Sequence, residues 1–173
     1  MTEAALPPVP APNMLGRPAI ARLIALLLPL ALLGGALGSQ YLGGLHPCEM
    51  CYWQRWPHAA AIVLAALAFT WPAESSPSRK VTLLAAAAIA VSGVIGIFHA
   101  GVEAGIFEGF TTCTALASAS TTDLLKQISQ APLVRCDEVQ FRFLGISMAG
   151  WNAILSLSGA AAIVFIALRG SRR

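Results

Sequence analysis

Two cysteines separated by two residues, Cys48 and Cys51, form a motif with its own redox chemistry. A Cys-x-x-Cys pair can close a small disulfide ring and tends to carry a lowered thiol pKa, so one sulfur is prepared to act as a nucleophile. Arg55 follows one helical turn after Cys51. A guanidinium beside a thiol stabilises the thiolate, and it can also donate a hydrogen bond to a carbonyl oxygen held there. The spacing therefore predicts a redox couple assisted by Arg55.

The composition places this motif in a membrane protein. Of the 173 residues, 57% are apolar and only 11% are charged, whereas soluble domains average about 25% charged residues. Four long segments carry no Asp, Glu, Lys or Arg, and each is close to the roughly 20 residues that a membrane-spanning helix needs. We expect spans at about residues 20–41, 57–72, 81–102 and 144–168, with Pro57 in the first turn of the second. The predicted fold class is all-α integral membrane, a bundle of four transmembrane helices.

The distribution of Lys and Arg predicts the orientation of this bundle. One side carries seven of these residues and the other side four, so the positive-inside rule places both termini in the cytoplasm. The seven are Arg17, Arg22, Arg79, Lys80, Arg169, Arg172 and Arg173, and the four are Arg55, Lys126, Arg135 and Arg142. Loops 42–56 and 103–143 then lie outside. Residues 1–17 are expected to form a disordered, Pro-rich cytoplasmic tail, 18–168 the membrane domain and 169–173 a second cytoplasmic tail.

The first span has an alternative interpretation as a secretory signal. Arg17 and Arg22 precede an apolar run that is followed by the small residues Ala36 and Gly38, as in a signal with its cleavage site. The apolar stretch continues to Leu45, which favours a retained span. Cleavage would not invert the topology of the remaining helices.

All four cysteines fall in the two outer loops. Cys48 and Cys51 lie in the first, and Cys113 and Cys136 in the second. An even number of thiols confined to the oxidising side indicates two disulfide-forming pairs. The second loop is too long for a simple connector. Within it, residues 121–132 predict a short helix that lies either in the membrane interface or against the bundle.

Helix packing in lipid depends on small residues, and two pairs have the required spacing. Gly34 and Gly38 form one small-x-x-x-small pair in the first span, and Ser92 and Gly96 form another in the third. Each pair either packs against a neighbouring helix or merely tolerates lipid. Together they favour a tight bundle.

Other uses of the cysteines compete with redox chemistry. Zinc could be bound by the four cysteines with His46 and His99, although the ligands would come from two loops with only one close pair, in an oxidising space. Covalent haem attachment requires His directly after Cys51, where Tyr52 stands. Structural disulfides in a non-catalytic membrane scaffold are the main alternative. A Cys48–Cys51 ring, however, would constrain the unfolded chain little.

Three parts of the sequence together resemble the DsbB family, the disulfide bond formation proteins B. They are residues 47–55 (PCEMCYWQR), residues 98–103 (FHAGVE) with Cys113, and residues 136–138 (CDE) with 143–152 (FLGISMAGWN). The resemblance extends from the first span to the last, and Arg55 has the family's offset from Cys51. Phe141 stands where the family usually has Trp, and Phe110 where Pro is frequent. These departures concern the contact of the second loop with the membrane surface and the partner.

The resemblance implies a relay of disulfide exchanges. A reduced DsbA-like thioredoxin-fold protein of the periplasm would attack a Cys113–Cys136 disulfide at Cys113. The freed Cys136 would then attack Cys48 and release Cys51 beside a membrane quinone. The resulting activity is that of a quinone-dependent oxidoreductase that generates disulfides in proteins, located in the bacterial inner membrane.

The resemblance also implies a quinone cofactor, either ubiquinone or menaquinone, and residues that hold it. Arg55 would stabilise both the Cys51 thiolate and the negative charge that grows on the quinone oxygen. Gln54 and His99 are further candidates for quinone binding. The sequence itself shows no Gly-rich dinucleotide motif and no haem signature, so a lipid-soluble quinone is the economical electron acceptor. We expect contact with membrane lipid and with the respiratory chain through the quinone pool, and no nucleic acid partner.

Overall fold

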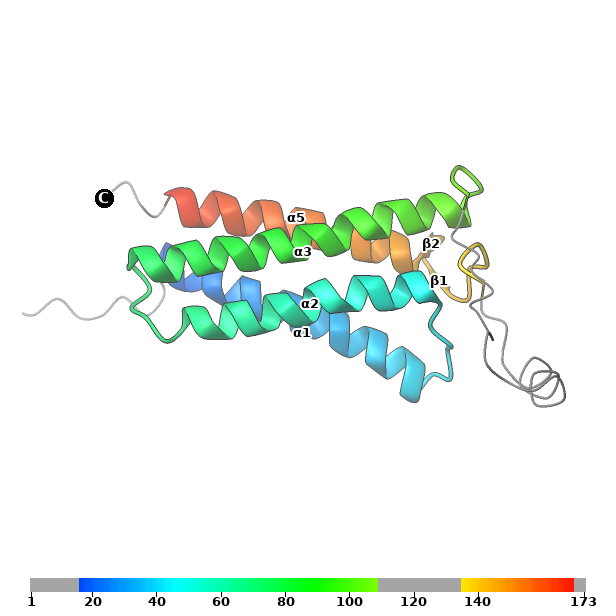
Figure 1. Cartoon of the computed structure of the whole chain (residues 1–173), viewed down its shortest axis with the longest axis horizontal. Helices are drawn as coiled ribbons and strands as arrows, with labels where there is room; N and C mark the ends of the chain where they lie inside the picture. Colours follow the sequence, from blue (N-terminus) through cyan, green and yellow to red (C-terminus); the bar gives the residue numbers. More distant parts are fainter. Residues whose placement is uncertain (1–15, 109–134, 170–173) are drawn as a thin grey trace, which may run out of the picture.

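The computed structural model describes residues 16–108 and 135–169 of the chain. Its four helices run alongside one another (Figure 1). They are α1 (Arg17–Tyr41), α2 (Glu49–Ala68), α3 (Ser76–Glu103) and α5 (Met148–Arg169). A hairpin of two short strands, β1 (Arg142–Phe143) and β2 (Ile146–Ser147), precedes α5. The predictions made for Cys113, for the short helix at 121–132 and for both extreme tails lie outside the described residues.

Three of the helices meet the length and hydropathy that a membrane crossing requires. These are α1, α3 and α5, with 25, 28 and 22 residues. Helix α2 is shorter and less apolar, because its first half carries Gln54, Arg55 and His58. The all-α membrane fold is thus confirmed through three helices, and the crossing of the bilayer by α2 stays a prediction.

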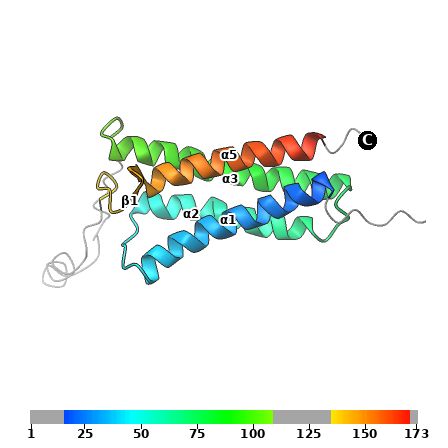
Figure 2. The ribbon, with the colours of Figure 1, turned by 180° about the vertical axis from the view of Figure 1, so that it is seen from behind.

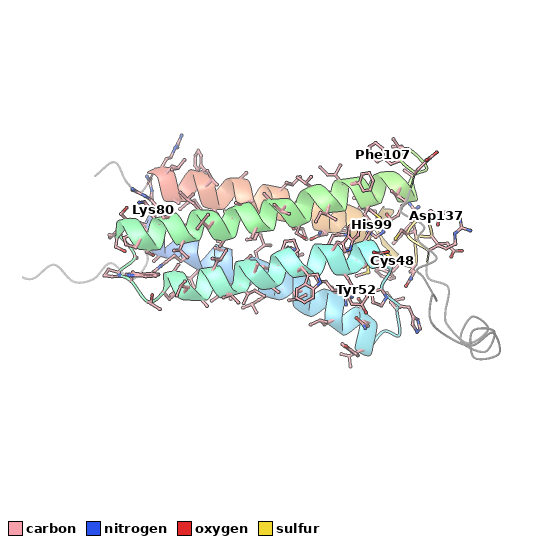
Figure 3. All side chains as sticks on the ribbon, viewed as in Figure 1. Cys48, Tyr52, Lys80, His99, Phe107 and Asp137 are labelled. Carbon is pink, nitrogen blue, oxygen red and sulfur yellow. The ribbon has the colours of Figure 1, made fainter. Side chains whose placement is uncertain are left out.

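The arrangement of the helices separates the bundle into two ends. Helix α3 packs along α2 and α5, and α1 packs on α2 and α5. The start of α1 and the end of α5 lie at one end of the bundle, together with Lys80 (Figures 1 and 3). Cys48 and His99 lie near the other end (Figure 3). Towards this second end, the last turns of α1 diverge from α2 in both ribbon views (Figures 1 and 2).

The two small-residue pairs have different surroundings. A Cβ atom on Gly96 would lie 3.0 Å from the carbonyl oxygen of Ala149, so the predicted close packing of the third span is confirmed against α5. A Cβ atom on Gly34 or Gly38 would meet no atom within 4 Å. That pair therefore makes no close helix contact among the described residues, and it belongs to the part of α1 that diverges.

The cysteine motif lies at the start of a helix that begins within the predicted loop 42–56. Helix α2 begins at Glu49, eight residues before the predicted span, and it ends at Ala68, four residues before the predicted end at 72. Cys48 is the N-cap, because its Sγ accepts a hydrogen bond from the backbone N–H of Cys51 at 3.4 Å. The carboxylate of Glu49 in the first turn suits the positive end of the helix dipole. Pro57 lies inside the helix rather than at its start.

The last helix begins after residue 144, where its span was predicted to start, because a tight hairpin precedes it. Leu144 and Gly145 both have positive φ, 52° and 81°, as a two-residue hairpin turn of the primed type requires. Arg142 pairs with Ser147 and Phe143 with Ile146 across the turn. Helix α5 consequently begins at Met148, four residues later than predicted.

Candidate redox site at the divergent end of the bundle

Three of the four cysteines lie together where α2 begins. The Sγ atoms of Cys48 and Cys51 are 3.0 Å apart. Cys48 is 5% exposed and Cys136 is 6% exposed, and both belong to a buried cluster with Met50 and Val102. Cys136 interacts with the Cys48 thiol and with the backbone of Met50. The predicted inner pair is thus brought together, with the second-loop Cys136 against it.

The contacts between the sulfurs give them unequal acidity. The hydrogen bond from Cys48, helped by the nearby charge of Arg55, lowers the pKa of the Cys51 thiol despite its partial burial. The same contact with Cys51, together with burial, raises the pKa of Cys48 to about 12. Burial also raises the pKa of Cys136. In the dithiol form, Cys51 is therefore the sulfur that carries the negative charge, as a nucleophile must.

His99 and Gln54 form a hydrogen-bonded support behind Cys48. The amide nitrogen of Gln54 donates to the backbone oxygen of Met50 at 3.2 Å and approaches Nδ1 of His99 at 2.8 Å. Because a backbone carbonyl can only accept, this contact fixes the amide orientation and makes His99 Nδ1 an acceptor. The ring hydrogen then sits on Nε2, which lies 3.6 Å from the Sγ of Cys48. His99 thus presents a donor to the sulfur of Cys48.

The same geometry bears on the zinc alternative. Sγ of Cys48, Sγ of Cys51 and a ring nitrogen of His99 all lie within 4.8 Å of one another, close enough for a metal ion. The Nε2 atom that faces the sulfurs carries its hydrogen, however, and a protonated nitrogen cannot coordinate zinc. His46 is exposed and lies outside this group. The arrangement therefore suits stabilisation of a thiolate better than metal binding.

Arg55 connects α2 to the divergent part of α1. Its guanidinium donates to the side-chain oxygen of Gln40 and, at 3.1 Å, to the backbone oxygen of Ala36. It also stacks over the ring of Tyr52, with 5.1 Å from Cζ to the ring centroid. Its Nε is buried and has no partner among the described residues. Two guanidinium nitrogens of Arg55 therefore bind α1, and its Nε–H is left without an acceptor among the described residues.

A cavity of about 630 Å³ extends from the cysteines into the space beside the divergent part of α1. Its volume lies within the range typical of small-molecule sites. One wall is the apolar face of α1, with residues such as Leu32, Gly35 and Ala36. The opposite wall carries the thiols and polar side chains, namely Cys48, Cys51, Gln54, Arg55, His58, His99, Glu103 and Asn152. Phe141 also lines the cavity, so its difference from the usual Trp lies at the site itself.

A buried polar network continues from Gln54 into the bundle, and the sequence analysis missed it. The amide of Asn152 donates to Oε1 of Gln54 at 2.7 Å, and its Oδ1 lies 2.9 Å from Nε2 of His58. The hydroxyl of Ser92 lies 3.0 Å from His58 and donates to the backbone oxygen of Gln54 at 2.8 Å. Polar residues in membrane helices are a signal of function. His58 lies inside the predicted span 57–72, and an ionisable histidine within a span is the sequence signal that points to this network.

Three membrane-length helices and a dithiol that faces a cavity define a class: a multi-pass membrane protein with a thiol site at one end of its bundle. The family model for disulfide bond formation protein DsbB matches residues 18–166. The chain therefore belongs to the DsbB family and is a disulfide-forming membrane oxidoreductase.

Individual relatives agree with this assignment. Disulfide bond formation protein B of Aromatoleum aromaticum is 32% identical over 146 residues, which cover 79% of this chain and 84% of the relative. Disulfide bond formation protein B 1 of Pseudomonas putida is 29% identical over 132 residues, or 76% and 73% of the two chains. Uncharacterized protein RP370 of Rickettsia prowazekii is 22% identical over 142 residues, or 80% and 81%. No solved structure matches the chain closely enough to count as a relative.

Proposed function

We propose that the chain is a thiol:quinone oxidoreductase that reoxidises a DsbA-like dithiol protein and passes the electrons to a membrane quinone. The observation that carries this proposal is the position of the Cys48–Cys51 pair, 3.0 Å apart at the start of α2 and facing a cavity of about 630 Å³. Cys136 beside Cys48 supports a route by which electrons reach this pair.

Disulfide exchange between the two loops is favoured by the position of Cys136 against Cys48. The Cys136 thiolate would attack a Cys48–Cys51 disulfide at Cys48, so that a Cys136–Cys48 bond forms, the old bond breaks and Cys51 leaves as a thiolate. The lowered pKa of Cys51 makes it the better leaving group of the pair. His99 would donate from Nε2 to the Cys48 sulfur whenever that sulfur becomes negative. We place Cys113, outside the described residues, as the sulfur that the partner attacks.

The cavity suits a quinone in both shape and polarity. A quinone has a flat apolar ring with carbonyl oxygens at its edge, and the cavity combines an apolar α1 wall with donors on α2. Arg55, whose buried Nε lacks a partner among the described residues, would donate to one of these oxygens. When bound, a quinone accepts two electrons and two protons and leaves as a quinol. One partner dithiol supplies both electrons and both protons when it is oxidised to a disulfide, so each partner disulfide corresponds to one quinol.

The orientation of the site follows from the same proposal. We place the cysteine end of the bundle at the periplasmic face of the bacterial inner membrane and the Lys80 end in the cytoplasm. The arginine and lysine distribution supports this placement. Electrons would then leave through the respiratory chain by way of the quinone pool.

A single reconstitution tests the proposal. The purified full chain in detergent is mixed with a reduced thioredoxin-fold dithiol protein and either a short-chain ubiquinone or a short-chain menaquinone. We expect one quinol formed for each partner disulfide formed, with the preferred quinone shown by the rates. A matched control is the Cys48→Ala, Cys51→Ala double variant, which keeps the helices but not the inner pair. If neither quinone is reduced by the wild type, the chain is better explained as a scaffold with structural disulfides.

A further inference from the structure

The orientation of Asn152 determines which ring nitrogen of His58 carries the hydrogen. The amide nitrogen of Asn152 lies 3.2 Å from the backbone oxygen of Ser92, which can only accept. Its Oδ1 therefore faces the other way, and it accepts from the hydroxyl of Ser156 at 3.0 Å and from Nε2 of His58 at 2.9 Å. Since an amide oxygen must receive a hydrogen, the neutral His58 ring has its hydrogen on Nε2.

This tautomer leaves Nδ1 of His58 as a bare acceptor. The side chain is only 3% exposed, and Nδ1 is buried without a hydrogen-bond partner among the described residues. Buried polar atoms are nearly always paired, so an orphaned one calls for an explanation. His58 lines the same cavity as Cys51 and Arg55. A ligand in that cavity with a hydroxyl group would supply the missing donor.

The position of His58 along α2 places this acceptor deeper than the donor. Cys51, Arg55 and His58 follow at intervals of four and three residues, which puts them on one face of the helix. At about 1.5 Å per residue, His58 lies about 4.5 Å further along the axis than Arg55 and about 10 Å further than Cys51. The cavity is thus lined by Arg55 near the sulfurs and by His58 farther in.

We propose that Nδ1 of His58 accepts a hydrogen bond from a ring hydroxyl of the hydroquinone, so that this residue binds the reduced ligand selectively. The inference rests on the proposed function and adds a residue that recognises the product form. A quinone carbonyl oxygen is itself an acceptor and gains nothing from neutral His58. A hydroquinone hydroxyl donates, and its binding relieves the unpaired nitrogen. Asn152 acts as a positioning residue, because it holds the ring in the accepting tautomer.

Nitrogen NMR of the histidine side chains tests this directly. The chain has three histidines, His46, His58 and His99, and single substitutions of His46 and His99 assign their signals. The full chain, labelled with ¹⁵N-histidine, is studied in detergent without oxygen and with its cysteines kept as thiols, so that no electron transfer occurs. The two probes are a short-chain hydroquinone and its dimethyl ether, which has the same ring but no hydroxyl donor. We expect the hydroquinone, and not the ether, to shift the Nδ1 signal of His58.

Two variants separate recognition from packing. In His58→Gln the amide nitrogen can replace the Nε2 donor to Asn152, but no acceptor remains at the Nδ1 position. We expect this variant to bind the hydroquinone about tenfold more weakly, which corresponds to the loss of roughly one hydrogen bond. Its affinity for the ether should stay the same. Both affinities are measured by titration on the His99 signal. Ser156→Ala is the matched control, because it removes a hydrogen bond to the same Asn152 oxygen and does not line the cavity. It should keep the wild-type preference for hydroquinone.

The possible failures are distinguishable. If the hydroquinone shifts His99 while the His58 signal stays in place, or if His58→Gln weakens both probes equally, His58 is not a recognition residue and the proposed function is unaffected. If neither probe moves any histidine signal and no quinone is reduced, the proposed function and this inference both fail.

Discussion

The two ends of the bundle each contain an arginine that ties α1 to α2, and their surroundings differ. Arg22 of α1 donates to the backbone oxygens of Ala68 and Trp71 at 3.2 and 2.9 Å, and it stacks over the ring of Phe69 at 4.6 Å. Arg55 of α2 donates in the same way to α1 and stacks over Tyr52. Each guanidinium leaves a buried Nε without a partner among the described residues.

What separates the two arginines is the space beside them. The hollow next to Arg22 measures about 10 Å³, room for one water molecule at most, and none of the cysteines that the structure describes lines it. The cavity next to Arg55 is about 630 Å³ and is lined by two thiols. Similar arginine contacts therefore hold the helices at both ends, whereas α1 diverges at only one end and leaves room there for a ligand.

Removing the sulfur at the cavity should have the largest effect on this comparison. With Cys51→Ser, we expect quinone reduction to fall at least about a thousandfold, because no thiolate remains beside Arg55. The helices should stay inserted, which a membrane extraction assay with the wild type as reference can verify. Near-normal turnover of this variant would mean that the Cys51 thiolate is not needed for quinone reduction and that the cavity at the divergent end is not the reactive site.

Replacing Cys136, the buried cysteine of the second loop, should stop the relay before electrons reach the Cys48–Cys51 pair. In Cys136→Ala, Cys113 is a free thiol, so its thiolate should attack the disulfide of the oxidised partner: a Cys113–partner bond forms, the partner disulfide breaks and one partner thiol is released. No neighbouring Cys136 thiol can then displace the partner, so the covalent complex should accumulate. Non-reducing gel electrophoresis measures it, with Cys113→Ala as the paired variant. Trapping through Cys136 in Cys113→Ala, and not through Cys113, would reverse the proposed order.

Replacing each arginine by lysine tests the comparison itself. Arg55→Lys keeps the charge but loses the planar set of donors, so we expect the Michaelis constant for quinone to rise about tenfold, equivalent to about 1.4 kcal/mol, while mixed-disulfide formation with the partner persists. The same substitution at Arg22 should lower thermal stability slightly and leave the quinone dependence unchanged. Equal changes at both positions would assign Arg55 a purely structural role.

The smallest expected effect is on the acidity of Cys51. Its pKa is lowered by the hydrogen bond from Cys48 and by the charge of Arg55. Since alkylation follows the thiolate fraction, Cys51 in the reduced protein should react with iodoacetamide at lower pH than an ordinary thiol, and Cys48, with a pKa of about 12, should react last. Arg55→Gln should move the onset for Cys51 to higher pH, whereas Arg22→Gln should not. Mass spectrometry of the alkylated peptides measures each site, and an identical onset in both variants would contradict the electrostatic role.

Local spacing was sufficient to predict part of the site. Cys51 and Arg55 are four residues apart, and any helix places such residues on one face. The apolar length of α1, α3 and α5 likewise predicts three spans without knowledge of their partners. The second span was predicted to begin after Arg55 because charged residues delimited the spans, whereas α2 begins at Glu49 with Cys48, which is not one of the usual capping residues, as its N-cap. Pro57 favoured the same late start, because proline is common in the first turn of a helix, but it lies inside α2.

The amino-acid sequence was enough for the redox motif, the membrane class and the position of Arg55 one turn after Cys51, because these depend on residue type and short-range periodicity. The position of Cys136 against Cys48 follows from tertiary packing alone. So does the link that Asn152 makes between Gln54 and His58, which are 98 and 94 residues away from it in the chain. Such contacts depend on which faces of α2, α3 and α5 pack together, and no local pattern specifies that. The cavity likewise exists because α1 diverges from its neighbours, which is a property of the packed bundle and not of any one helix.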